Sequence, residues 1–186
     1  MKRNLAVLVL ALLAAAPLTA STFVAMTPNE LVAQADAVVV GQVVERFSAW
    51  TDSGRLIYTD NTLRVDEVVL GEAPAFVTVR TFGGQVGDVI VEAHGFPQLA
   101  GDERVLLFLK DEGDAGAVRV LGYQQGHFRV VTRLDGVTLA VPMVDEGVRL
   151  LDRAGQAVAA PESVRLEALK AQILVRAERL GRALAK

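Results

Sequence analysis

The chain contains no cysteine, and its 186 residues include only two histidines and one tryptophan. The absence of cysteine excludes disulfide bonds, thiol catalysis, disulfide exchange and metal sites built from thiolates. Stability therefore has to come from a hydrophobic core, and the 52% hydrophobic content makes such a core feasible. His94 and His127 are the only imidazole groups available to any site.

Apolar runs long enough to cross a membrane are absent beyond the first residues of the chain. Lys2 and Arg3 precede a continuous apolar run from Leu5 to Ala16, and "PLTA" then ends in small residues before Ser21. This order predicts a signal peptide over residues 1–20 and a mature chain that begins near Ser21. The alternative is an uncleaved N-terminal anchor. We expect an exported protein, periplasmic or extracellular.

Basic side chains are fewer than acidic ones. Without Lys2 and Arg3 the mature chain has 17 basic and 22 acidic side chains, a formal charge of −5. This balance argues against nucleic-acid binding, which needs a clustered positive field. The 166 residues that remain are the usual size of one domain.

Strand patterns dominate the middle of the chain and are separated by short turn signals. The segments with β-branched runs or polar–apolar alternation are residues 35–47, 55–72, 75–82, 103–110, 117–123, 126–132 and 136–142. Gly41 interrupts the first of them where a bulge or bend fits. The segment "ERVLLFLK" is apolar on both faces, which is typical of a central strand. The spacing predicts a mainly β fold, a small antiparallel barrel or sandwich.

Helix signals lie at the two ends of the mature chain. Thr27, Pro28 and Glu30 form a capping-box pattern that predicts a short helix over residues 27–35. Apolar residues at helical spacing predict a C-terminal amphipathic helix within residues 161–186, after a linker over residues 146–160. We expect this basic helix to dock on its own domain; the alternatives are contact with a partner or with a membrane surface.

The order of four segments resembles the netrin-like OB-fold domain, typified by tissue inhibitors of metalloproteinases. The segments are "ADAVVVGQVV", "TLRVDEVVLGE", "VTVRTFGG" and "GDERVLLFL", within residues 35–110. The resemblance implies an OB-like β-barrel over residues 21–145. Inhibitors of that family chelate the protease zinc through an N-terminal cysteine, whereas the mature chain here begins "STFVAM". The resemblance therefore implies the fold of that family for this chain, but not its inhibitory chemistry.

The connector "GGQVGDVIVEAHGFPQLAGDE", residues 83–103, holds the densest group of polar residues. On an extended strand Asp88, Glu92 and His94 would share one face, where two carboxylates and an imidazole could bind a divalent cation. The spacing is unspecific, so we expect a solvated connector that covers one end of the barrel. Trp50 lies beside the turn "TDSG", where it could contact a partner or close the barrel end. We predict that Trp50, Asp88, Glu92 and His94 form a partner-binding surface.

No complete catalytic signature is present. The glycines at 83–87 lack the Lys–Ser/Thr of a P-loop, and no Gly-x-Ser-x-Gly elbow occurs. His127 and Arg129 alternate with Phe128, which is typical of the exposed face of a strand. We therefore expect a non-enzymatic binding protein without a cofactor, with a protein partner as one possibility. The alternatives are a regulator or inhibitor of an extracytoplasmic protease, and a metal-dependent enzyme that uses Asp88, Glu92 and His94.

Overall fold

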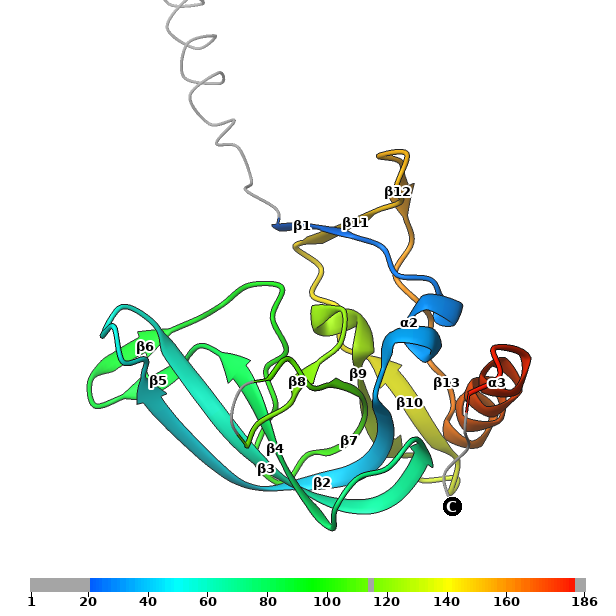
Figure 1. Ribbon diagram of the computed structural model, residues 1–186, viewed down its shortest axis with the longest axis horizontal. Coiled ribbons are helices and arrows are strands. Elements are labelled where there is room, and N and C mark those ends of the chain that lie inside the picture. Colours follow the sequence, from blue (N-terminus) through cyan, green and yellow to red (C-terminus); the bar gives the residue numbers. More distant parts are fainter. Residues whose placement is uncertain (1–20, 114–115, 183–186) are drawn as a thin grey trace, which may run out of the picture.

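The computed structural model describes residues 21–113 and 116–182 (Figure 1). The predicted signal peptide lies outside these residues. The elements in chain order are β1 (Ser21–Val24), α2 (Pro28–Gln34), β2 (Ala37–Trp50), β3 (Ile57–Leu70), β4 (Phe76–Phe82), β5 (Gly84–Val86), β6 (Val89–Val91), β7 (Arg104–Lys110), β8 (Arg119–Val120), the 3₁₀ helix η1 (Tyr123–Gly126), β9 (His127–Thr132), β10 (Thr138–Pro142), β11 (Val148–Leu151), β12 (Ala157–Val158), β13 (Val164–Arg165) and α3 (Leu166–Arg179). Neither described helix has the length and apolar character needed to span a membrane.

One large antiparallel sheet dominates the fold. Its strand order is β13-β10-β9-β7-β2-β3-β4, and β8 pairs with the end of β7. Each of the seven segments predicted to be strands contributes to this sheet, so the mainly β prediction is confirmed. The path of the strands is open among the described residues, and the closed barrel that we expected is not observed. One parallel bridge, Val79 to Val118, links β4 to the residues just before β8.

Strands β2 and β7 lie at the centre of the sheet because both are apolar on both faces. Residues 105–109 of β7 are all buried, as the pattern "ERVLLFLK" predicts. The pairing of β2 with β3 shifts register between Val40 and Gly41, which confirms the predicted irregularity at this glycine. A Cβ atom at Gly41 would come within 2.4 Å of the carbonyl oxygen of Arg64, so the two backbones approach closely here.

The two faces of these central strands belong to two separate cores. Val40 and Phe108 face a core that includes Phe128 and the apolar sides of both helices. Val39 and Leu107 face a second core, enclosed by β2, β3, β4, β7 and the connector. Successive side chains of a strand point to opposite faces, so one uninterrupted apolar run serves both cores.

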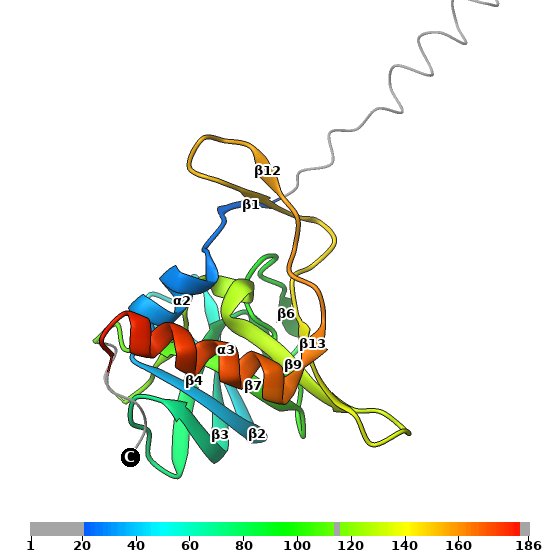
Figure 2. The ribbon, with the colours of Figure 1, turned by 90° about the vertical axis from the view of Figure 1, so that its right-hand side faces the viewer.

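Both helices cover the first core. Thr27 caps α2 as predicted: its hydroxyl accepts from the Glu30 amide, and the Glu30 carboxylate accepts from the Thr27 amide at 2.8 Å. Helix α3 docks on its own domain through Leu166, Ile173 and Ala177, which confirms the expected docking (Figure 2). It is shorter than the C-terminal segment predicted to be helical, because residues 161–165 are extended and include β13.

Residues 146–160, which the sequence predicts to be a linker, contain two strands. Strand β11 pairs in parallel with β1 and antiparallel with β12, giving a small three-stranded sheet. This sheet stands apart from the large one and arches over the N-terminus of α2 (Figures 1 and 2). The pairing of β1 with β11 joins residues more than 120 positions apart, from Ser21 with Val148 to Val24 with Leu151, so no local pattern indicates which strands pair here. We call residues 144–162 the arch.

Candidate functional site

The surface predicted around Trp50 is assembled only in part as expected. Trp50 is the last residue of β2 and is 40% exposed, and Asp88, Glu92 and His94 are exposed in the connector. The extended strand on which Asp88, Glu92 and His94 would share one face is not formed, because β6 ends at Val91 and His94 lies in a turn. Gly95 follows with a φ of 84°, a conformation that ends the extended run.

The structure does bring the connector to the end of β2 and β3. Its first part forms a hairpin, β5–β6, beside this end of the sheet (Figure 1). The Thr59 hydroxyl donates to the carbonyl oxygen of Gly83 at 2.7 Å, and Gly84 lies against the side chain of Ser48. Five exposed large apolar side chains lie on this hairpin and on the β2–β3 hairpin: Phe47, Trp50, Leu56, Val89 and Ile90.

A metal site is not formed by the candidate ligands. Within residues 21–113 and 116–182, no group of three or more histidine, aspartate or glutamate side chains is arranged to hold a metal ion. Asp88, Glu92 and His94 therefore remain separate exposed groups on the connector. The structure adds no support to the metal-dependent alternative.

His127 is buried, which contradicts the exposed strand face expected for it. Its side chain is 1% exposed and lies under the end of the connector, with Nε2 at 4.0 Å from Glu103 Oε1. Neither ring nitrogen has a hydrogen-bond partner within the part of the chain that the structure describes. Burial lowers the pKa of His127 to about 4; the negative charge of Glu103 opposes this shift and the positive charge of Arg129 adds to it. The imidazole is consequently neutral at pH 7.

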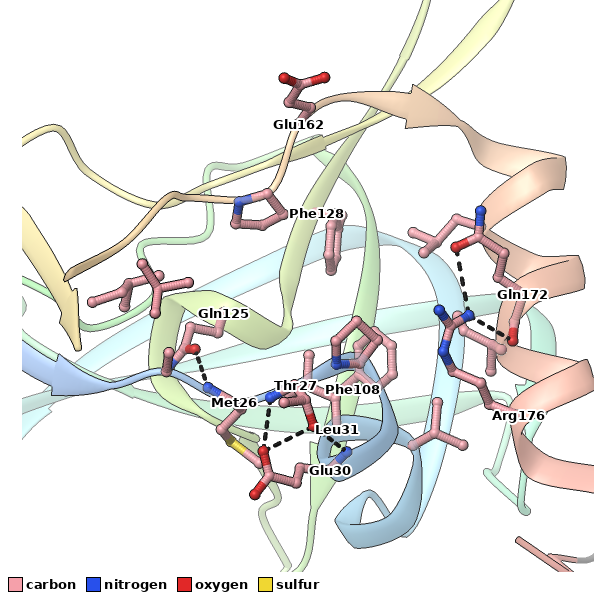
Figure 3. Close-up of a pocket in the computed structure, with 18 of the residues that line it drawn as sticks. Met26, Thr27, Glu30, Leu31, Phe108, Gln125, Phe128, Glu162, Gln172 and Arg176 are labelled. Atoms are coloured by element: carbon pink, nitrogen blue, oxygen red, sulfur yellow. Dashed lines mark hydrogen bonds between the residues drawn. The ribbon is translucent and has the colours of Figure 1, made fainter. Parts of the chain in front are cut away.

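A large cavity lies elsewhere, between α2, α3 and the arch. It has a volume of about 630 Å³, within the range of small-molecule sites. The rings of Phe108 and Phe128, 6.2 Å apart, form its floor (Figure 3). Leu31 of α2 and Ile173 of α3 form two walls, and Leu150 and Val158 of the arch form the roof. Most of the lining is apolar.

Polar contacts near the start of α2 hold residues 24–26 in place and join this segment and α2 to the arch. Gln125 of η1 accepts a hydrogen bond from the Met26 amide at 2.7 Å and donates to the carbonyl oxygen of Val24 at 3.1 Å. The backbone amide of Ala25 donates to Leu151 at 2.7 Å. An ion pair joins Arg153 of the arch to Glu30 of α2 at 2.5 Å. The last two contacts join the arch to the start of α2, beside the cavity that Glu30 and Arg153 line.

Glu30 is held ionised by its surroundings. Hydrogen bonds from the backbone and then the hydroxyl of Thr27 lower the pKa of this carboxyl, and Arg153 adds a smaller effect in the same direction. The same carboxylate therefore caps α2 and anchors the arch. Among the described residues that line the cavity, Thr27 has the only hydroxyl side chain, and it is already hydrogen-bonded to Glu30.

Sequence reasoning missed this cavity. Its lining comes from stretches that are far apart in the sequence: residues 25–32, 108, 125–128, 150–164 and 169–176. One feature of the sequence does indicate β11, which contributes Leu150 to the lining. In "VRLL" at 148–151 the polar Arg149 lies between apolar Val148 and Leu150, and in the structure Arg149 is exposed and Leu150 is buried. That pattern is typical of a short strand rather than a linker.

Comparisons with known proteins do not identify a family for this chain. No protein-family model matches it, and searches of curated proteins and of solved structures returned no significant match.

Proposed function

We propose that this chain is an exported, non-enzymatic binding protein that takes an apolar small ligand into the cavity beneath the arch. The observation that carries the proposal is the cavity itself, about 630 Å³ in volume and floored by Phe108 and Phe128. Concave, mainly apolar sites with a few polar groups at the rim are typical of small-molecule binding. Binding is favoured over catalysis because the Thr27 hydroxyl in the cavity is occupied by Glu30, with no histidine beside it.

The scaffold that we propose is a partly open OB-like barrel, as the resemblance to netrin-like domains implies. Strands β2, β3 and β4 form a meander, and β7 returns to pair with β2. The Val79–Val118 bridge is parallel, and β8 then pairs antiparallel with β7. This circuit of pairings agrees with a five-stranded, partly open Greek-key barrel. Strands β9, β10 and β13 extend the sheet beyond it, and α3 packs against β10, β13 and β3.

Export is the part of the proposal that rests on the sequence. The basic pair Lys2–Arg3, the apolar run and the small residues before Ser21 support cleavage after residue 20. A periplasmic or extracellular binding protein without cysteine does not depend on the redox state of its compartment.

Titration of the mature chain with n-alkyl alcohols tests the proposed function. Dodecanol, kept below its solubility limit, should bind with a stoichiometry of one and raise the melting temperature. Affinity should rise by about fourfold for each added methylene, since burial of each is worth roughly 0.8 kcal/mol, until the cavity is full. A folded protein that binds none of these alcohols would contradict the proposal.

A second candidate function is contact with a protein through the two adjacent hairpins. The observation that favours it is the group of exposed apolar side chains there, including Phe47, Trp50 and Ile90. A protease is one such partner, suggested by the family resemblance alone. Capture from the periplasm or culture fluid, followed by mass spectrometry, tests this candidate.

A further inference from the structure

Five charged side chains line the cavity: Glu30, Asp152, Arg153, Glu162 and Arg176. Glu30 and Arg153 neutralise each other in the ion pair that fastens the arch. The Asp152 carboxylate accepts hydrogen bonds from the amides of Ala154 and Gln156 within its own turn. Three of the five charges are therefore engaged by the protein.

The other two charged side chains, Glu162 and Arg176, point in different directions. The carboxylate of Glu162 is turned away from the other labelled side chains, whereas the guanidinium group of Arg176 is turned from α3 into the cavity, toward Phe108 (Figure 3). Arg176 is half-buried, and its Nη1 donates to the backbone oxygen of Gln172 at 3.1 Å and to Oε1 at 3.5 Å. Both of these acceptors are uncharged.

Arg176 also lacks a charged partner. Across residues 21–113 and 116–182, no carboxylate lies within salt-bridge distance of its guanidinium group. A guanidinium group has five N–H donors in a planar fork that fits a carboxylate with two parallel hydrogen bonds. The wall of an apolar cavity thus carries one positive charge whose remaining donors are available to a ligand.

We infer that the ligand is a free single-chain amphiphile with an anionic carboxylate head, its chain in the apolar cavity and its head on Arg176. This inference rests on the proposed function and adds the chemistry of the ligand to it. The volume of about 630 Å³ suits one flexible chain. The head would replace water around a partly buried cation, where a charge-assisted bidentate pair is stronger than at the open surface.

The test compares dodecanoate with dodecanol, at equal chain length, at pH 8 and below the critical micelle concentration. Wild-type protein should bind dodecanoate at least tenfold more tightly than dodecanol. Arg176→Gln should remove this preference by lowering dodecanoate affinity at least tenfold more than dodecanol affinity, and Arg176→Lys should retain part of it. The control is Arg179→Gln, which removes the same charge from an exposed position of α3 that does not line the cavity. This control should bind dodecanoate as the wild type does.

The other outcomes separate the two proposals. Failure to bind either compound overturns the proposed function and the inference together. Equal affinity for both compounds overturns the inference alone. The proposed function would then stand, with an uncharged apolar ligand. The same loss in Arg179→Gln as in Arg176→Gln also overturns it, because the effect would then be one of net charge. Sedimentation with phosphatidylglycerol vesicles without binding of monomeric dodecanoate would overturn it in favour of a membrane surface.

Discussion

Nε2 of His127 lies 4.0 Å from Oε1 of Glu103 in the folded protein, yet this carboxylate does not keep the imidazole protonated at pH 7. The same oxygen, Oε1 of Glu103, lies 2.5 Å from Nε of Arg129, which is more exposed and permanently charged. The Ala100 amide donates to the other oxygen at 2.8 Å. Glu103 thus joins the end of the connector to β9. His127 is buried and neutral beside the Glu103–Arg129 ion pair and does not take part in it.

The first prediction is that stability falls as the pH is lowered from about 6.5 toward 4. The unfolded chain takes up a proton on His127 near its ordinary pKa of 6.5, whereas the folded protein does so only near pH 4. The unfolded state binds more protons in this window, so acidification favours it, by at most about 3 kcal/mol. Urea unfolding of wild type and His127→Leu at pH 7.5, 5.5 and 4.5 measures the effect.

His127→Leu should show a clearly smaller loss of stability over this range, and exposed His94→Leu should behave like wild type. Carboxylates titrate in all three proteins, so their contribution cancels in the comparison. Equal pH dependence in wild type and His127→Leu would show that the imidazole does not control it.

The second prediction concerns the bulge in β2. Gly41→Ala should destabilise the fold by about 2 kcal/mol, since the added Cβ would lie 2.4 Å from the Arg64 oxygen and one strand would have to move. Gly101→Ala is the matched control, because a Cβ there meets nothing within 4 Å. Thermal and urea unfolding measure both changes. Similar stabilities of the two variants would rule out a close strand approach at Gly41.

The third prediction tests the roof of the cavity. Val158→Asp places a charge on the apolar lining and should weaken dodecanol binding at least tenfold, because the chain would have to desolvate a carboxylate. Val175→Asp is the control, since Val175 is 45% exposed against 42% for Val158 and lies outside the cavity. Calorimetric titration of both variants gives the comparison. Equal binding by Val158→Asp and wild type would place the ligand elsewhere.

The fourth prediction concerns Trp50. Trp50→Ala should leave the melting temperature nearly unchanged, because the side chain is 40% exposed at the end of a hairpin. If a protein partner is captured, the same change should cost roughly 2 kcal/mol of affinity. Phe76→Ala, another exposed aromatic at the opposite end of the β3–β4 pairing, should retain the partner. An unfolded Trp50→Ala protein would assign Trp50 to the core instead.

The fifth prediction is that protein purified from its native host begins at or near Ser21. The basic n-region, the apolar run and "LTA" before Ser21 motivate it. Intact-mass measurement and N-terminal sequencing provide the test. Material that still begins at Met1 would contradict export by cleavage and favour the N-terminal anchor.

Elements with strong local patterns were predictable from the sequence. The capping box at Thr27, the apolar run of β7 and the interruption at Gly41 each have a local physical cause that acts within a few residues. Alternation and turn signals likewise indicated seven strands of the large sheet. A helix cap, a buried strand and a bulge need no knowledge of what lies far along the chain.

The tertiary structure alone decided what surrounds those elements. Residues 148–151 are a strand because β1 lies beside them, and His127 is buried because Glu103 and the end of the connector cover it. The cavity exists only where α2, α3 and the arch meet, with Arg176 in its wall. Each of these features depends on pairing or burial between residues distant in the sequence. The sequence by itself therefore determined the mainly β class, the two helices and the strands of the large sheet other than β13, while long-range packing decided the short strands outside them and the environment of each candidate site residue.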